Sequence, residues 1–312
     1  VSDRAGDTIL NFKRPKSAMS ISEVDLRIVE ARVSAYLGRG WQADTIDNKT
    51  NAASHPAAVL SDGEFAVFVK VGEGPLAADR FRQEAHGLHL LSEQAGVLTP
   101  EILGIVETEG GAALLLEGVR EIARDDAHYR QMGRALAQVH STKGVRFGLD
   151  SHCYWGDLYQ DNTPAADWPT FFWERRLAPR LKAALDSGNL PARFVGEIEQ
   201  LGARLPALCG PAVAPALLHG DAHKNNCLAT PRGPLFIDPS VYYGHPEMDL
   251  SYVDFFEPVP DEVFAGYAEI APLDPGFWER RELWRLPALL AMVEFIGAEY
   301  LDKLDAAVRH YH

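Results

Sequence analysis

The chain has 312 residues, of which 46% are hydrophobic and 24% charged, the balance of a globular protein with one or two domains. No run of 18 apolar residues predicts a membrane span, and the formal net charge of −14 disfavours nucleic acid and anionic membranes as partners. Three cysteines without a CxxC pair predict neither a disulfide framework nor a zinc site, so a cytoplasmic protein is expected.

The first part of the chain alternates helical and strand patterns. We predict a helix over 23–37, strands over 57–61 and 64–71, a helix over 76–94, and strands over 102–108 and 112–117. Asp62-Gly63 is a typical hairpin turn between the first two strands. In the second of these strands the charged Lys70 shares a face with apolar residues, which indicates that it has a functional role.

After Gly118 helical patterns dominate. They cover about 126–140, 168–184, 194–205 and the region from 261 onward, around a compact strand-loop-strand segment at 217–238. We therefore predict an α+β fold with a lead-in of residues 1–20 that is loosely packed or disordered. It is followed by an N-terminal lobe over 21–117, with an antiparallel sheet and a helix, and a mostly α C-terminal lobe over 118–312.

The segment 217–240 carries the strongest chemical pattern. It contains His219-Gly220-Asp221, then Asn226, and then a hydrophobic strand that ends in Asp238. This order is typical of kinases, in which a carboxylate orients the acceptor hydroxyl and two oxygen ligands hold Mg²⁺ at the ATP phosphates. We predict Asp221 as the catalytic base, Asn226 and Asp238 as metal ligands, and His219 as a structural support of the loop.

The N-terminal lobe supplies the expected partners of this segment. Lys70 lies on a hydrophobic strand and Glu84 on the next helix, where a lysine can reach the ATP phosphates and a glutamate can hold it. Glu117 opens the connector whose backbone is expected to bind the adenine base. Taken singly, each of these residues could be an ordinary surface or turn residue, and it is their common order that indicates a two-lobed protein-kinase-like fold.

With these residues identified, the chain resembles the fructosamine kinase family, a branch of the aminoglycoside-phosphotransferase-like kinases. The resemblance spans about 23–300 and includes FVK at 68–70, RFRQEAHGL at 80–88, FGLDSHCYWG at 147–156, DWPTFFWERRLAPRL at 167–181 and IDPSVYYGHPEMDL at 237–250. It implies ATP and Mg²⁺ as cofactors and a ketosamine, a sugar joined to an amine, as acceptor. It also implies that Asp249 is a buried carboxylate bracing the catalytic loop, although a helix cap is an alternative.

Two features depart from the family pattern. Leu-Trp usually follows His-Gly-Asp, and the Trp is expected against the substrate, but here Ala222 and His223 follow. The loop expected over the phosphates, 47–55, contains no glycine, so Ser54 and its small neighbours would have to bring backbone amides to the phosphate. These departures leave the reaction type intact and the acceptor open.

Four further residues are candidates for contacting the acceptor: His223, Lys224, Tyr242 and His245. An exposed loop tip is the alternative for the first two and packing for the others. Trp155, Trp168 and Trp173 are predicted to pack in the core or between lobes.

The leading hypothesis is an ATP- and Mg²⁺-dependent kinase that phosphorylates a hydroxyl of a ketosamine. The alternative is an antibiotic phosphotransferase, which the sequence HGDAHKNN at 219–226 favours. A more remote alternative is a pseudokinase that binds nucleotide without turnover. The oligomeric state stays open.

Overall fold

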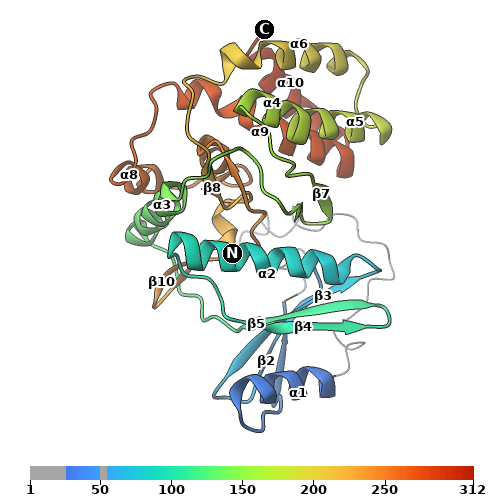
Figure 1. Cartoon of the computed structure of the whole chain (residues 1–312), viewed down its shortest axis with the longest axis vertical. Coiled ribbons are helices and arrows are strands. Elements are labelled where there is room, and N and C mark those ends of the chain that lie inside the picture. The colour runs from blue at the N-terminus through green and yellow to red at the C-terminus, as the bar shows by residue number, and fades with distance from the viewer. Residues whose placement is uncertain (1–25, 50–54) are drawn as a thin grey trace, which may run out of the picture.

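The computed structural model describes residues 26–49 and 55–312, and it has two lobes (Figure 1). The N-terminal lobe contains α1 (Leu26–Leu37), β1 (Thr45–Asn48), β2 (Ala57–Ser61), β3 (Ala66–Glu73), α2 (Ala77–Ala95), β4 (Ile102–Thr108) and β5 (Gly111–Glu117). The rest contains α3 (Asp126–Ser141), β6 (Cys153–Trp155), β7 (Leu158–Gln160), α4 (Trp168–Phe172), α5 (Ala178–Asp186), α6 (Arg193–Leu208), β8 (Ala216–Leu218), β9 (Cys227–Thr230), β10 (Gly233–Phe236), β11 (Tyr242–Gly244), α7 (Glu247–Tyr252), α8 (Glu262–Ala268), α9 (Phe277–Phe295) and α10 (Leu301–Arg309). The predicted lead-in, 1–20, lies outside the described residues.

The N-terminal lobe is a five-stranded sheet of order β1-β2-β3-β5-β4, and all neighbouring strands are antiparallel. Val29 and Val33 of α1 pack on one face, and Phe81 and Leu88 of α2 pack on the other. In Figure 1, α2 therefore lies between the sheet and the helical lobe. The α+β fold with an antiparallel sheet and a following helical lobe is confirmed. The short polar strand β1 was not predicted.

The helical lobe is centred on α9, most of whose residues are buried. Helices α3 and α8 approach closely because Gly133 and Gly266 face each other's helix. A Cβ at Gly133 would lie 1.9 Å from the Val263 carbonyl oxygen, and one at Gly266 would lie 2.0 Å from that of Arg130. Only glycine allows this approach.

The helix predicted over 168–184 is present, but it is not α-helical throughout. A π-helical turn, Trp173–Leu177, separates α4 from α5. Pro179 has no N–H to donate to the carbonyl oxygen of Arg175, and that oxygen instead accepts a hydrogen bond from the Arg176 guanidinium at 3.0 Å. Sequence periodicity does not detect such a local change in hydrogen bonding.

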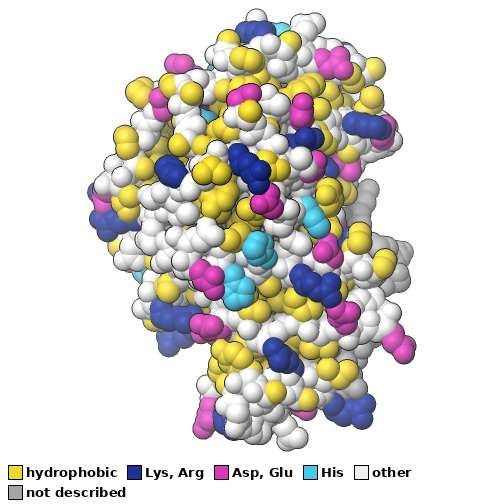
Figure 2. Space-filling model, viewed as in Figure 1, with side chains coloured by type: hydrophobic (Ala, Val, Ile, Leu, Met, Phe, Trp, Pro, Cys, Tyr) yellow, Lys and Arg dark blue, Asp and Glu magenta, His cyan; other side chains and the backbone are white. Residues whose placement is uncertain are grey.

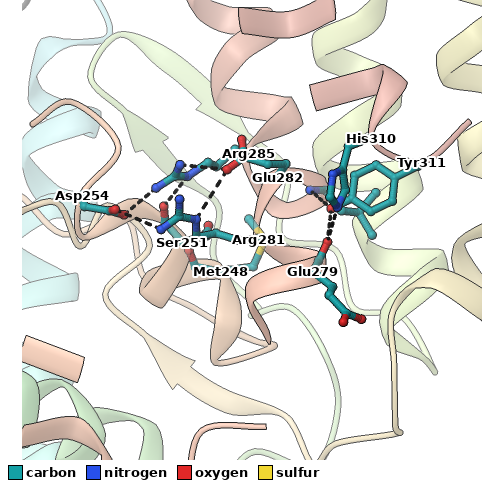
Figure 3. A network of polar contacts seen from close by, with 10 residues as sticks. Met248, Ser251, Asp254, Glu279, Arg281, Glu282, Arg285, His310 and Tyr311 are labelled. Atoms are coloured by element: carbon teal, nitrogen blue, oxygen red, sulfur yellow. Dashed lines mark hydrogen bonds and ion pairs between the residues drawn. The ribbon is translucent and has the colours of Figure 1, made fainter. Parts of the chain in front are cut away.

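A polar network fixes α7 to α9 (Figure 3). The Asp254 carboxylate accepts hydrogen bonds from Arg281 at 3.1 Å and from Arg285 at 2.5 Å. Arg285 also donates to the backbone oxygen of Ser251 at 2.8 Å. These contacts hold the short helix that carries Asp249 against the centre of the lobe.

The surface mixes charges of both signs. Figure 2 shows acidic and basic side chains interspersed with apolar ones on the viewed face. Within the described ranges, every helix is too short or too polar to cross a membrane.

Candidate functional site

A cavity of about 750 Å³ is lined by residues of both lobes. Seven residues predicted from sequence line it: Lys70, Glu84, Glu117, Asp221, His223, Asn226 and Asp238. These residues come from β3, α2, the end of β5 and the segment that follows β8. Ser54, predicted to bind phosphate, lies outside the described residues, but Lys49 and His55 on either side of that gap line the cavity.

The loop after β8 is stabilised by hydrogen bonds of the His219 side chain, which belongs to the loop itself. The Nε2 of this fully buried histidine donates to the carbonyl oxygen of Ile237 at 2.9 Å, and its Nδ1 accepts from the Asp221 N–H at 3.2 Å. Burial lowers the pKa of His219, which keeps the imidazole neutral, as this pair of hydrogen bonds requires. Gly220 has φ of 82°, and a Cβ there would lie 2.0 Å from the Ser240 carbonyl oxygen, so only glycine fits.

Asp249 supports the same loop by binding two of its backbone N–H groups. Its fully buried carboxylate accepts the backbone N–H groups of His219 at 2.7 Å and Gly220 at 2.9 Å. A third contact, with His140 Nε2 at 3.1 Å, also fixes this carboxylate. One carboxylate thus satisfies two buried backbone donors next to Asp221.

The Asp221 side chain lines the cavity. Its Oδ2 accepts from Asn226 Nδ2 at 3.0 Å, whereas its buried Oδ1 has no hydrogen-bond partner among the described residues. Burial raises the pKa of Asp221 to about 7, against the lowering effect of the Trp155 indole N–H. A cavity-lining carboxylate with this pKa is suited to accept a proton near neutral pH.

Lys70 is buried between two carboxylates. Its Nζ lies 3.0 Å from Glu84 Oε2 and 2.7 Å from Asp238 Oδ1. Burial alone would lower the pKa of Lys70, but the two carboxylates raise it well above its ordinary value, so it stays charged. Burial raises the pKa of Glu84 to about 7, and although burial acts the same way on Asp238, Lys70 holds the pKa of Asp238 below its ordinary value.

Asp238 also has an unusual backbone. Its φ of 52° is the only positive value among the described non-glycine residues. Such a conformation is sparsely populated and persists where neighbouring contacts fix it, often at functional sites. Here it accompanies the turn that follows the β9–β10 hairpin and the ion pair with Lys70.

The connector after β5 lines part of the cavity with Glu117 and Val119. The Glu117 carboxylate pairs with Arg232 at 3.0 Å, and the backbone N–H groups of Glu117 and Gly118 donate to Glu101 and Ala66 at 2.8 Å each. These two N–H groups therefore already donate hydrogen bonds within the protein. Val119, which also lines the cavity, is the next connector residue.

His223 and Lys224, adjacent in sequence, have different surroundings. His223 lines the cavity with its Nε2 3.7 Å from Asp221 Oδ2, and its buried Nδ1 has no partner among the described residues. Burial lowers the pKa of His223 to about 4, so its imidazole is neutral at neutral pH. Lys224 instead forms an ion pair with Glu257, and it is absent from the described lining.

Tyr242 and His245 lie away from this cavity, in the packed helical lobe. Tyr242 stacks on Phe171 with centroids 5.5 Å apart, and it reaches a separate, smaller cavity. His245 stacks on Trp284 at 5.2 Å, and burial lowers its pKa to about 4. Among the described residues, the structure thus gives both side chains packing contacts and does not bring them to Asp221.

The sequence analysis missed the contribution of the β6–β7 hairpin. Tyr154, Trp155 and Gly156 line the large cavity, and the Trp155 indole lies beside Asp221. We had predicted Trp155 to pack in the core or between lobes, and it does contact Tyr252 at 6.3 Å between centroids. The sequence signals at this place were the family segment at 147–156 and its turn glycine directly after two aromatic residues, Gly156, which has φ of 59°.

The residues present fit a magnesium ion. Mg²⁺ prefers oxygen ligands and often takes only one or two from the protein, the others coming from phosphate and water. Asn226 donates its amide N–H to Asp221, which leaves its carbonyl oxygen available, and Asp238 offers a carboxylate on the same cavity. In the described part of the chain, no group of three or more His, Cys, Asp or Glu side chains is placed to hold a metal ion.

Comparison with known proteins agrees with this geometry. Residues 27–311 match the family model described as fructosamine kinase. A probable ketoamine kinase of Vibrio parahaemolyticus is 29% identical over 255 residues, which cover 80% of this chain and 86% of that protein. The crystal structure of a "putative fructosamine-3-kinase" from Thermobifida fusca has a TM-score of 0.80 at 32% identity, covering 90% of this chain and 97% of that one.

A more distant likeness concerns the fold alone. The aminoglycoside phosphotransferase APH(4)-Ia, in a ternary complex with AMP-PNP and hygromycin B, has a TM-score of 0.61 at 14% identity and covers 91% of this chain and 98% of that one. Because this identity is low, it supports the kinase-like architecture and not the antibiotic alternative. The chain belongs to the fructosamine kinase family and is a small-molecule phosphotransferase with a two-lobed, kinase-like fold.

Proposed function

We propose that this protein transfers the γ-phosphate of ATP to a hydroxyl of a ketosamine in the presence of Mg²⁺. The observation that carries the proposal is the convergence of Lys70, Asp221, Asn226 and Asp238 on one cavity. The family membership and the relatives named ketoamine kinase support the choice of acceptor.

Each residue has a role that follows from its contacts. The Asp221 carboxylate accepts a hydrogen bond from the acceptor hydroxyl and takes its proton as the new oxygen–phosphorus bond forms and the bond to ADP breaks. Lys70, held by Glu84, binds the phosphates. Asn226 and Asp238 would hold Mg²⁺, which when bound neutralises charge on the phosphate oxygens.

The supporting residues keep this arrangement rigid. Asp249 and His219 fix the backbone from His219 to Asp221, and His223 lines the cavity with its Nε2 3.7 Å from Asp221 Oδ2. In the connector, we assign adenine binding to the segment from Glu117 to Val119. We keep the lobe boundary at residue 117.

The test is ADP release with Mg-ATP across a panel of fructosamines, ribulosamines, aminoglycosides and sugar-bearing nucleoside antibiotics, with Asp221→Asn as the blank. Mass spectrometry of the acceptor identifies the product. We expect phosphorylation of ketosamines alone. Turnover confined to an antibiotic would replace the proposed acceptor, and nucleotide binding without any turnover would indicate a pseudokinase.

A further inference from the structure

A second cavity, of about 310 Å³, lies beside the proposed active site. Trp155 lines both cavities, and the consecutive residues Gly220 and Asp221 line the small and the large one, respectively. Since consecutive Cα atoms are about 3.8 Å apart, the two spaces adjoin at the catalytic loop. Tyr159, which is 53% exposed, also lines the small cavity, so solvent reaches its rim.

The wall of this small cavity is positively charged. Arg175, Arg176 and Arg180 line it, and Asp161 is the only carboxylate among its described lining residues. The whole chain carries a net charge of −14, so the charge of this arginine cluster is opposite in sign to the net charge of the protein. Arg175 pairs with Asp161 at 3.5 Å and with Glu174 at 3.4 Å, and Arg180 pairs with Glu294 at 3.4 Å.

Arg176 differs from its two neighbours because it is buried, at 4% exposed, and forms no ion pair with a described carboxylate. It donates to the backbone oxygens of Asp161 at 2.8 Å and Arg175 at 3.0 Å, and to Asn162 Oδ1 at 2.6 Å. Its guanidinium lies over the Tyr242 ring, 4.0 Å from the centroid. A buried cation without a neutralising partner is costly, and such residues are normally paired.

One donor of this guanidinium is left over. The Nε of Arg176 is buried and has no acceptor in hydrogen-bonding geometry among the described residues, although the Tyr242 hydroxyl is near. Guanidinium groups characteristically bind carboxylates through parallel N–H donors. The π-helical turn that carries Arg175 and Arg176 places both on the same cavity, and such turns recur at functional sites.

We propose that this arginine cavity binds a carboxylate on the amine side of the acceptor, so that the enzyme prefers ketosamines derived from amino acids. This inference rests on the proposed function. With its hydroxyl at Asp221, the acceptor extends along the Trp155 indole and its carboxylate reaches Arg176, with Arg175 at the rim. The apolar and aromatic remainder of the wall, including Tyr252 and Met248, covers the carbon skeleton.

The test compares fructosyl-glycine with fructosyl-glycinamide, which have the same skeleton and differ in the carboxylate. With saturating Mg-ATP, we expect kcat/KM to favour the carboxylate by roughly tenfold to a hundredfold, the range for a hydrogen bond to a charged group. Arg175→Gln and Arg176→Gln should bring this ratio close to one. The matched control Arg309→Gln, an exposed arginine of α10, should keep the ratio of the wild type.

A second measurement separates this inference from the proposed function. Calorimetry without nucleotide compares binding of the two ligands to the wild type and to Arg175→Gln, whose side chain is partly exposed and whose loss the fold should tolerate. Equal turnover of both ligands by the wild type overturns the carboxylate site and leaves the kinase function standing. If neither ligand is turned over, the proposed function fails. In that case the carboxylate site is still supported if the wild type binds fructosyl-glycine more tightly than fructosyl-glycinamide and Arg175→Gln does not. If the wild type shows no such preference, the carboxylate site is overturned.

Discussion

Replacing Asp221 with Asn should remove activity and at the same time change how stability depends on pH. The substitution keeps the size of the side chain and removes the group that takes the proton. General base catalysis is typically worth 10²–10⁴-fold, so kcat should fall by about that factor while nucleotide binding persists. In the wild type, kcat/KM should rise with pH up to about 7, where Asp221 titrates, and then level off.

The stability effect follows from the raised pKa of Asp221, about 7 in the folded protein against 3.8 for an ordinary Asp. Because the folded-state pKa is the higher one, the wild type loses stability as pH rises from about 4 to about 7. At about 1.4 kcal/mol per pKa unit, the buried charge costs about 4 kcal/mol at pH 8 and about 2 kcal/mol at pH 5. The Asn side chain carries no such charge.

Asn introduces its own cost, because its NH₂ group would occupy the position of the unpartnered Oδ1. A buried donor without a partner costs about 1–3 kcal/mol at any pH. The difference in unfolding free energy between variant and wild type should therefore shift by about 2–3 kcal/mol in favour of the variant between pH 5 and pH 8.

Urea unfolding at pH 5 and pH 8 measures this shift, with Asp302→Asn on an exposed position of α10 as control. If the difference in unfolding free energy between the Asn variant and the wild type does not change with pH, a buried carboxyl with a raised pKa at this position is refuted. An Asn variant with more than a tenth of the wild-type kcat would refute the role of Asp221 as base.

Three further substitutions test the remaining contacts. Lys70→Met should abolish ATP binding in calorimetry and lower the unfolding free energy by about 3 kcal/mol, because two carboxylates lose their cation; unchanged ATP affinity would contradict this role. Asp238→Ala should weaken nucleotide binding at least tenfold with Mg²⁺ and little without it, and equal effects in both conditions would argue against metal ligation. Asp249→Asn should cost about 2–4 kcal/mol of stability and lower kcat, because its NH₂ group would face a backbone N–H; a kcat equal to that of the control Asp302→Asn would exclude a positioning role.

Much of this protein could be predicted where the determining information is local in sequence. The spacing from His219 to Asn226 and the hairpin before Asp238 lie within 20 residues, so turn residues and short strands restrict how these side chains meet. Alternating apolar residues likewise predicted the antiparallel sheet, and the change to helical patterns after Gly118 predicted the two lobes. The long helix predicted over 168–184 is present, but a π-helical turn near a proline, where one N–H donor is missing, interrupts its α-helical hydrogen bonding.

Contacts between distant segments could not be predicted in this way. Lys70 and Asp238 are 168 residues apart, and the pairing of their side chains depends on how the two lobes pack. The same holds for Trp155, whose indole reaches Asp221 from another hairpin, and for His245, which packs against Trp284 instead of reaching the cavity. The sequence by itself determined the kinase chemistry and its order along the chain. Only the tertiary structure decided which side chains surround the acceptor, because side-chain packing and burial depend on residues that are not neighbours in sequence.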